Sequence, residues 1–210
     1  MLDKILVFGD SISYGKWDVE GGWVARVRRY IDEKYNIKDR ANLQVCNLGI
    51  PGEVAVRMVD RVEEELAFRH VDPEDDILVI FAIGINDSCP NNWMTEKQTS
   101  EKDFKEALKK MAEVALSKNC KVLFLGLTPI REGDSMGKRG LLFTNEVVKK
   151  YDSYISDVTK ELKVEKLDLF EELKKEGYKE EMVDIVHPNS EGHEMIAKRV
   201  TEYLSENYNI

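Results

Sequence analysis

Short apolar runs alternate along the chain with longer segments of helical period, the pattern of a parallel α/β sheet. In chain order the runs are Ile5–Phe8, Leu43–Cys46, Ile77–Ala82, Val122–Leu127 and a weaker one at Val164–Leu169. Three of them are apolar almost throughout, which is typical of strands buried on both faces. The third run is the most apolar, so it is predicted to lie at the centre of the sheet.

The segments between the runs place apolar residues three and four positions apart, which favours helices that bury one face against the sheet. These stripes comprise Trp23, Val27, Tyr30 and Ile31; Val59, Val62 and Leu66; Phe104, Leu108, Met111, Ala115 and Leu116; Val147, Val148, Tyr151, Ile155 and Val158; and Ile196, Val200, Tyr203 and Leu204. Residues 1–210 are therefore predicted to form one domain, a three-layer α/β/α sandwich. Its flavodoxin-like five-stranded parallel sheet would have the order 2-1-3-4-5.

Two irregular stretches, Asp87–Ser100 and Arg131–Gly140, follow predicted strand ends. Open α/β sheets bind ligands at that edge, so both stretches are candidate substrate loops.

The composition excludes several classes of protein. With 42% hydrophobic residues, 34% charged residues and a net charge of −9, the chain is an ordinary globular protein. Its acidity argues against nucleic acid or an anionic membrane surface as partner. No apolar run approaches the roughly 20 residues of a membrane-spanning helix, so no stable membrane insertion is expected. The sequence is compatible with a homo-oligomer.

The cysteines and the N-terminus bear on location. Cys46, Cys89 and Cys120 are odd in number and lack metal-ligand spacing, which favours a reducing compartment. Residues Lys4–Phe8 already form a predicted core strand, which leaves no room for a signal peptide. The sequence therefore predicts a cytoplasmic protein.

Ser11 follows the first predicted strand in the segment Phe8–Ser13. A glycine permits a tight turn there, and the serine hydroxyl would be exposed above the sheet beside backbone N–H groups. The alternative is that Asp10 and Ser11 only cap a turn or helix. The Gly-x-Ser-x-Gly elbow of α/β-hydrolases is absent, because Ser13 occupies the place of its second glycine.

Two further segments, Asn47–Gly52 and Ala82–Asp87, follow the second and third strands. A backbone N–H of Gly52 and the side-chain amide of Asn86 are suited to bind a developing oxyanion. The alternatives are an ordinary Gly-Pro turn for the first segment and an Asx-turn for the second.

Asp184 and His187 lie three residues apart just before the last predicted helix. One short turn can bring the carboxylate against Nδ1 of the imidazole and leave Nε2 free to accept a proton. A purely structural histidine would need neither Asp184 nor the following Pro188. In the predicted strand order, strands 2 and 3 flank strand 1, so the segments with Gly52 and Asn86 would flank Ser11.

Taken together, these four segments resemble the GDSL-type, or SGNH, hydrolases, and the likeness spans nearly the whole chain. The resemblance implies a serine ester hydrolase with Ser11, His187 and Asp184 as catalytic triad. It also implies an oxyanion hole formed by Ser11, Gly52 and Asn86, with no metal or organic cofactor. There are two departures from the family's pattern. Ile12 replaces the leucine of Gly-Asp-Ser-Leu, and Pro51 stands where a small polar residue is common, which affects the shape of the oxyanion loop.

The expected substrate is a small-molecule ester, with short acyl chains favoured because no long apolar lid is evident. Asp10, Trp17, Trp93 and Met94 are assigned to substrate binding. The alternatives are a lysophospholipase or thioesterase acting on longer chains and, in another class, a non-catalytic flavodoxin-like ligand-binding module. The module would account for the first segment but not for Asp184 and His187.

Four other residues compete for a catalytic role. Ser135 lies in a second Gly-Asp-Ser, but without a sharp strand-to-helix turn, and Cys89 is a thiol close to Asn86. Both are expected to be structural, and His70 and His193 are expected to be surface or helix residues.

Overall fold

The apolar runs form one parallel sheet in a computed structural model that describes residues 2–39, 42–70, 72–91, 97–133, 140–208 and 210. The order is β2-β1-β3-β4-β5, so the predicted topology is confirmed. The strands are β1 (Lys4–Gly9), β2 (Gln44–Gly49), β3 (Ile77–Ala82), β4 (Lys121–Leu125) and β5 (Glu165–Leu167). As predicted, the most apolar strand is central.

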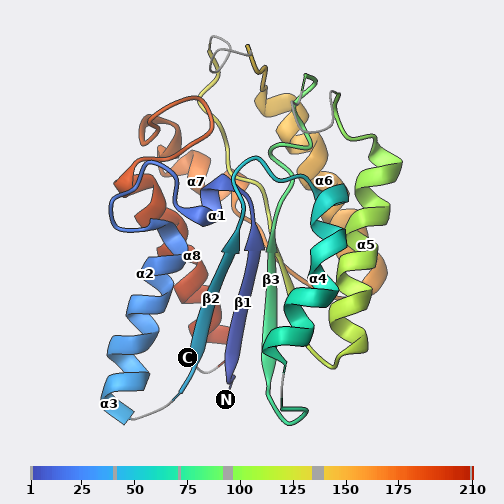
Figure 1. The fold of residues 1–210 in the computed structure, drawn as a ribbon. Helices are drawn as coiled ribbons and strands as arrows, with labels where there is room; N and C mark the ends of the chain where they lie inside the picture. Colours follow the sequence, from blue (N-terminus) through green and yellow to red (C-terminus); the bar gives the residue numbers. More distant parts are fainter. Residues whose placement is uncertain (1, 40–41, 71, 92–96, 134–139, 209) are drawn as a thin grey trace.

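Helices cover both faces of the sheet and complete the three layers (Figure 1). On one face α2 (Gly22–Ile31) packs against α8 (Ser190–Tyr208). On the other, α4 (Ala55–Arg69), α5 (Glu101–Ser117) and α6 (Asn145–Leu162) pack in a row. The predicted apolar stripes all fall in these five long helices.

Five short helical segments were not predicted, because they are too short to show a period. They are α1 (Ser11–Tyr14), the π-helix η1 (Asp32–Asn36), α3 (Ile37–Asp39), α7 (Phe170–Lys175) and the 3-10 helix η2 (Tyr178–Glu180).

Two predicted strand boundaries, at Leu43 and Leu127, differ from the observed ones because side chains bind the backbone there. Leu43 was expected to open the second strand, but its N–H donates to Oδ1 of Asn36 (3.0 Å) and its carbonyl accepts from Nδ2 of Asn36 (2.9 Å). Leu127 was expected to end the fourth, but its N–H donates to Asp152 (2.8 Å). Each backbone group is therefore bonded outside the sheet.

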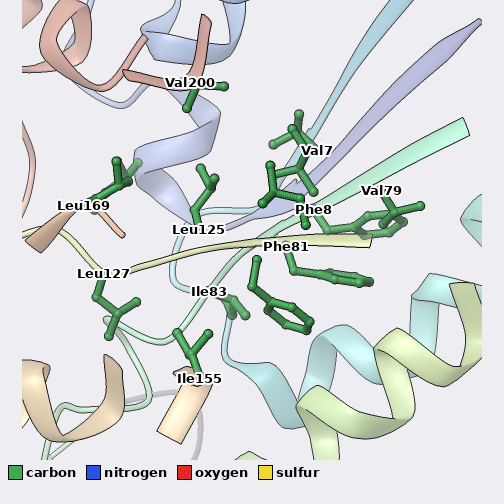
Figure 2. Close-up of a cluster of buried hydrophobic side chains, with 14 of the residues drawn as sticks. Val7, Phe8, Val79, Phe81, Ile83, Leu125, Leu127, Ile155, Leu169 and Val200 are labelled. Atoms are coloured by element: carbon green, nitrogen blue, oxygen red, sulfur yellow. The ribbon is translucent and has the colours of Figure 1, made fainter. Parts of the chain in front are cut away.

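An aromatic row crosses the three central strands on one face of the sheet. Phe8 lies opposite Phe81, and Phe81 opposite Phe124, with ring centroids 5.6 and 5.1 Å apart. Figure 2 shows Val7 and Leu125 on the other face. Burying each of these Phe side chains stabilises the fold by about 1.5–3 kcal/mol, so the row contributes strongly to the core.

The strand register brings three strand ends level. Gly9, the last residue of β1, pairs with Gly49 of β2 and Ala82 of β3. The loops with Ser11, Gly52 and Asn86 therefore start at one edge of the sheet.

Candidate active site

Ser11 begins α1 after a strand-to-helix turn that requires glycine. A Cβ on Gly9 would lie 2.1 Å from Oγ of Ser13, so a larger residue would not fit. Asp10 caps the helix, and its Oδ1 accepts from the N–H of Ile12 at 2.9 Å. The Ser11 hydroxyl is thereby held at the carboxyl edge of β1.

Two hydrogen bonds connect Ser11 with the Asp-x-x-His segment. Oγ of Ser11 lies 2.8 Å from Nε2 of His187, and Nδ1 of His187 lies 2.7 Å from Oδ2 of Asp184. The sequence separation between Ser11 and His187 is 176 residues. The arrangement is that of a nucleophile, a base and an orienting carboxylate.

The Asp184 carboxylate is held by backbone N–H groups of the turn that follows it. Oδ1 of Asp184 accepts from the N–H of Val186 (3.0 Å) and of His187 (2.8 Å). Burial alone raises the pKa of Asp184, but the imidazole and these two N–H groups outweigh it and hold the pKa well below its usual range. Asp184 is therefore charged at neutral pH, as a partner for an imidazolium must be.

The amide of Asn86 is hydrogen-bonded to the residues next to Ser11 and Gly52, the other two predicted oxyanion donors. Its Nδ2 donates to the carbonyl of Glu53 (3.1 Å) and to Oδ2 of Asp10 (3.3 Å). Glu53 follows Gly52 and Asp10 precedes Ser11, so Asn86 lies next to both segments.

Gly52 lies in a tight turn that also explains Pro51. The N–H of Glu53 donates to the carbonyl of Ile50 (3.1 Å), and Gly52 has φ +82°. Proline followed by a residue of positive φ is the pattern of a type II turn. The departure at Pro51 thus suits the turn, and only glycine adopts the next position without strain.

Two buried carboxyls adjoin Asn86. Asp10 is 3% exposed, and Asp87 is fully buried with its oxygens accepting from the N–H of Ala55 (3.1 Å) and the hydroxyl of Thr99 (2.8 Å). Burial raises the pKa of Asp10 to about 6 and that of Asp87 to about 7, although the hydrogen bonds partly oppose it.

The residues assigned to substrate binding have different surroundings. Asp10 is buried and is hydrogen-bonded to Asn86 and Ile12, so its role in substrate binding stays a prediction. Trp17 is 60% exposed, and its indole N–H donates to Oδ2 of Asp184 (3.3 Å). Trp93 and Met94 lie outside the described residues.

None of the described competing residues is hydrogen-bonded to Ser11, His187 or Asp184. Cys89 is buried, burial raises the pKa of its thiol, and the thiol donates to Asn91 (3.3 Å). Ser135 lies outside the described residues. His193 is in α8 and fully buried, and His70 ends α4.

Sequence reasoning missed the supporting groups around Asn86, namely Asp87, Thr99 and the carbonyl of Glu53. Asp87 was visible in the segment Gly-Ile-Asn-Asp, but nothing local indicates its contacts with Ala55 and Thr99.

Among the described residues, no group of three or more His, Cys, Asp or Glu is arranged to hold a metal ion. The same part of the chain contains no helix long and apolar enough to cross a lipid bilayer.

The family follows from a sequence comparison. The profile of the GDSL-like Lipase/Acylhydrolase family matches residues 5–200. The chain belongs to this family. The resemblance of the four segments is thereby confirmed, and the chain is placed among the ester hydrolases. The comparison with curated proteins finds no match.

GDSL-type esterases also share its fold. Axe2, an acetylxylan esterase from Geobacillus stearothermophilus, is 21% identical with a TM-score of 0.74 over 97% of this chain and 93% of that one. A lipase/acylhydrolase from Enterococcus faecalis is 20% identical with a TM-score of 0.72 over 98% of this chain and 96% of that one. The three-layer fold is thus that of the family.

Proposed function

We propose that this GDSL-type hydrolase is a serine esterase with Ser11 as nucleophile, His187 as general base and acid, and Asp184 as the partner of the imidazole. One observation supports this above all others, the continuous chain of 2.8 and 2.7 Å hydrogen bonds through these three residues.

The reaction proceeds through an acyl-enzyme. His187 takes the hydroxyl proton at Nε2 as Oγ of Ser11 forms a bond to the ester carbonyl carbon. The tetrahedral intermediate then breaks its bond to the alcohol oxygen, which receives the proton from His187. Water attacks the acyl-Ser11 by the same steps in reverse and releases the acid. Asp184 holds Nδ1 and stabilises the imidazolium, and no metal or organic cofactor is required.

The oxyanion is bound by the N–H groups of Ser11 and Gly52 and by the amide of Asn86. The Nδ2 of Asn86 donates to Asp10 at 3.3 Å and to Glu53 at 3.1 Å, and in the proposed mechanism the longer bond, to Asp10, gives way to the oxyanion. Each such donor is typically worth about 3 kcal/mol in the transition state.

The substrate we favour is a small-molecule ester with a short acyl group, such as acetyl. No long apolar segment that could cover an acyl tail is evident in the sequence. The acetylxylan esterase with a similar fold points the same way. Trp17, with Trp93 and Met94, is proposed to contact the ester.

Two alternatives remain distinct hypotheses. A lysophospholipase or thioesterase would prefer long acyl chains. A non-catalytic flavodoxin-like binding module would leave the hydrogen-bonded pair of Asp184 and His187 without a use. A cytoplasmic location and a homo-oligomer also remain predictions.

The decisive experiment compares wild type with Ser11→Ala on p-nitrophenyl esters from acetyl to dodecanoyl. We expect hydrolysis by wild type alone, fastest with the shortest chains. Rates that rise steadily toward dodecanoyl would favour the lysophospholipase. If no ester is cleaved, labelling by a fluorophosphonate probe separates a narrow esterase from a binding module, because only an activated Ser11 reacts.

A further inference from the structure

The loop between α1 and α2 is closed at its base by three glycines, Gly15, Gly21 and Gly22. A Cβ on Gly15 would lie 2.5 Å from the backbone of Gly21, and one on Gly22 would lie 2.4 Å from Cα of Gly15. All three glycines have positive φ, between +79° and +87°. The loop therefore begins and ends at one point, and its shape is set by the backbone.

A buried ion pair anchors this loop to the helices behind it. The fully buried side chain of Asp18 accepts from the guanidinium of Arg26 and from the N–H of Gly22 (2.9 Å). Arg26 also donates to Oγ of Ser190 (2.7 Å) and to Glu194 (3.0 Å) in α8. Although burial opposes it, the bond to Arg26 with the backbone bonds lowers the pKa of Asp18 to about 2.

The anchored loop holds Trp17 in an unfavourable backbone conformation. Its φ is +70°, in the left-handed region that bulky residues rarely occupy. Such conformations cost on the order of 1–3 kcal/mol and persist where the surrounding structure enforces them, often at functional sites.

The indole of Trp17 lies against the candidate triad. Its Nε1 donates to Oδ2 of Asp184 across 167 residues of sequence, and the same oxygen accepts from Nδ1 of His187. Oδ1 accepts from the N–H groups of Val186 and His187. Each carboxylate oxygen thus accepts two hydrogen bonds, and among the described residues the indole is the one donor from outside the Asp184–His187 turn.

We infer that Trp17 is a positioning residue of the triad, whose indole N–H fixes the rotation of the Asp184 carboxylate and tempers its attraction for the imidazolium. This inference rests on the proposed function, because it assumes that His187 is the general base. It is separate from the proposed contact of Trp17 with substrate, which involves the exposed part of the ring.

The inference predicts a specific change in pH dependence. Without the indole N–H, the carboxylate keeps more of its negative charge for His187 and stabilises the imidazolium more strongly. Asp10 and His193 also interact electrostatically with His187, and both are unchanged when the indole is removed. Because the base must be neutral to accept a proton, the acidic limb of the kcat/KM profile then moves to higher pH. At the same time kcat falls, because the carboxylate is less firmly oriented.

The test compares Trp17→Phe with wild type and with Val19→Ala. Phenylalanine keeps an aromatic body without the N–H, and Val19 is a 98% exposed neighbour in the same loop. For Trp17→Phe we expect kcat to fall roughly five- to tenfold and the acidic limb of kcat/KM to rise by roughly half a pH unit. Val19→Ala should match wild type in both.

A second measurement needs neither substrate nor a stable Trp17 variant. The indole N–H resonance of Trp17 in the wild-type protein should move when Asp184 is replaced by Asn, while that of the buried Trp23 stays. An unmoved Trp17 signal, or an unshifted acidic limb in an active Trp17→Phe, overturns the inference. Failure of the proposed function is recognised differently, because wild type itself would then neither hydrolyse esters nor label.

Discussion

The structure on either side of Ser11, the proposed nucleophile, is built by different means. On the oxyanion side, Asn86 is held by the buried carboxyl of Asp10 and the carbonyl of Glu53, with buried Asp87 alongside. On the base side, a three-residue turn joins Asp184 to His187, and the Asp184 side chain is 27% exposed. The first arrangement needs long-range packing, whereas the second is largely local.

The difference appears in the carboxyl groups. Burial raises the pKa of Asp10 and Asp87, so charging them opposes folding, whereas hydrogen bonds lower the pKa of Asp184. Burial of Asp10 and Asp87 therefore reduces stability at neutral pH, whereas the charged Asp184 adds to it.

The largest effect is expected when the hydrogen bond between Ser11 and His187, which joins the two sides, is removed. Ser11→Ala and His187→Ala should each lower kcat by roughly 10⁴-fold, because nucleophile and base act as a unit. Hydrolysis of p-nitrophenyl acetate measures this. Ser13→Ala is the matched control, since the buried Ser13 hydroxyl has no partner among the described residues and the variant should stay within about threefold of wild type. Ser11→Ala retaining a tenth of the rate would contradict the assignment.

The next effect concerns the oxyanion side alone. Asn86→Ala should reduce kcat by about 10²- to 10³-fold, the usual consequence of removing one oxyanion donor. Because Ser11 and His187 remain intact, fluorophosphonate labelling should persist at a reduced rate. A kcat equal to that of wild type would mean that Asn86 is structural.

The third prediction is that the two sides change the free energy of unfolding with pH in opposite directions. Unfolded aspartates lose their protons near pH 4, whereas native Asp10 and Asp87 keep theirs until about 6 and 7. The native state therefore binds more protons in this window, and the free energy of unfolding falls as pH rises from about 4 to 7. Asp184, with its lowered pKa, acts in the opposite sense and loses its contribution as pH falls below about 4.

Urea unfolding at pH 5 and pH 8 tests this prediction. Wild type should lose at least about 1 kcal/mol from these two groups, and Asp87→Asn should show a smaller loss. Glu206→Gln, at an exposed position on α8, should retain the wild-type difference. An equal slope in Asp87→Asn would show that Asp87 is ionised in both states.

The smallest effect is expected for the thiol nearest the oxyanion side. Cys89→Ala should change kcat less than about twofold, because the thiol is buried and bonded to Asn91. A roughly 10⁴-fold lower kcat in this variant, with Ser11→Ala still active, would instead make Cys89 the nucleophile.

Much of the molecule could be predicted from sequence. Continuous apolar runs identified the strands, and a spacing of three and four residues identified the long helices, because burial follows a regular pattern along a single element. The order of the strands followed from the rules for parallel α/β sheets. The four motif segments allowed the candidate site residues to be predicted, because a tight turn or a three-residue spacing is visible locally. These residues are Ser11, Gly52, Asn86, Asp184 and His187. Strand ends at Leu43 and Leu127 were misplaced, because distant side chains compete for their backbone groups.

The tertiary structure alone decided which distant groups meet. The strand order already predicted that the motif loops lie side by side, but only the structure shows that Asn86 donates to Asp10 (3.3 Å). The contact between Trp17 and Asp184 depends on a loop closed by glycines and anchored by Asp18. Local patterns report how one element is buried, but contacts between segments far apart depend on the path of the chain and the packing of the whole fold.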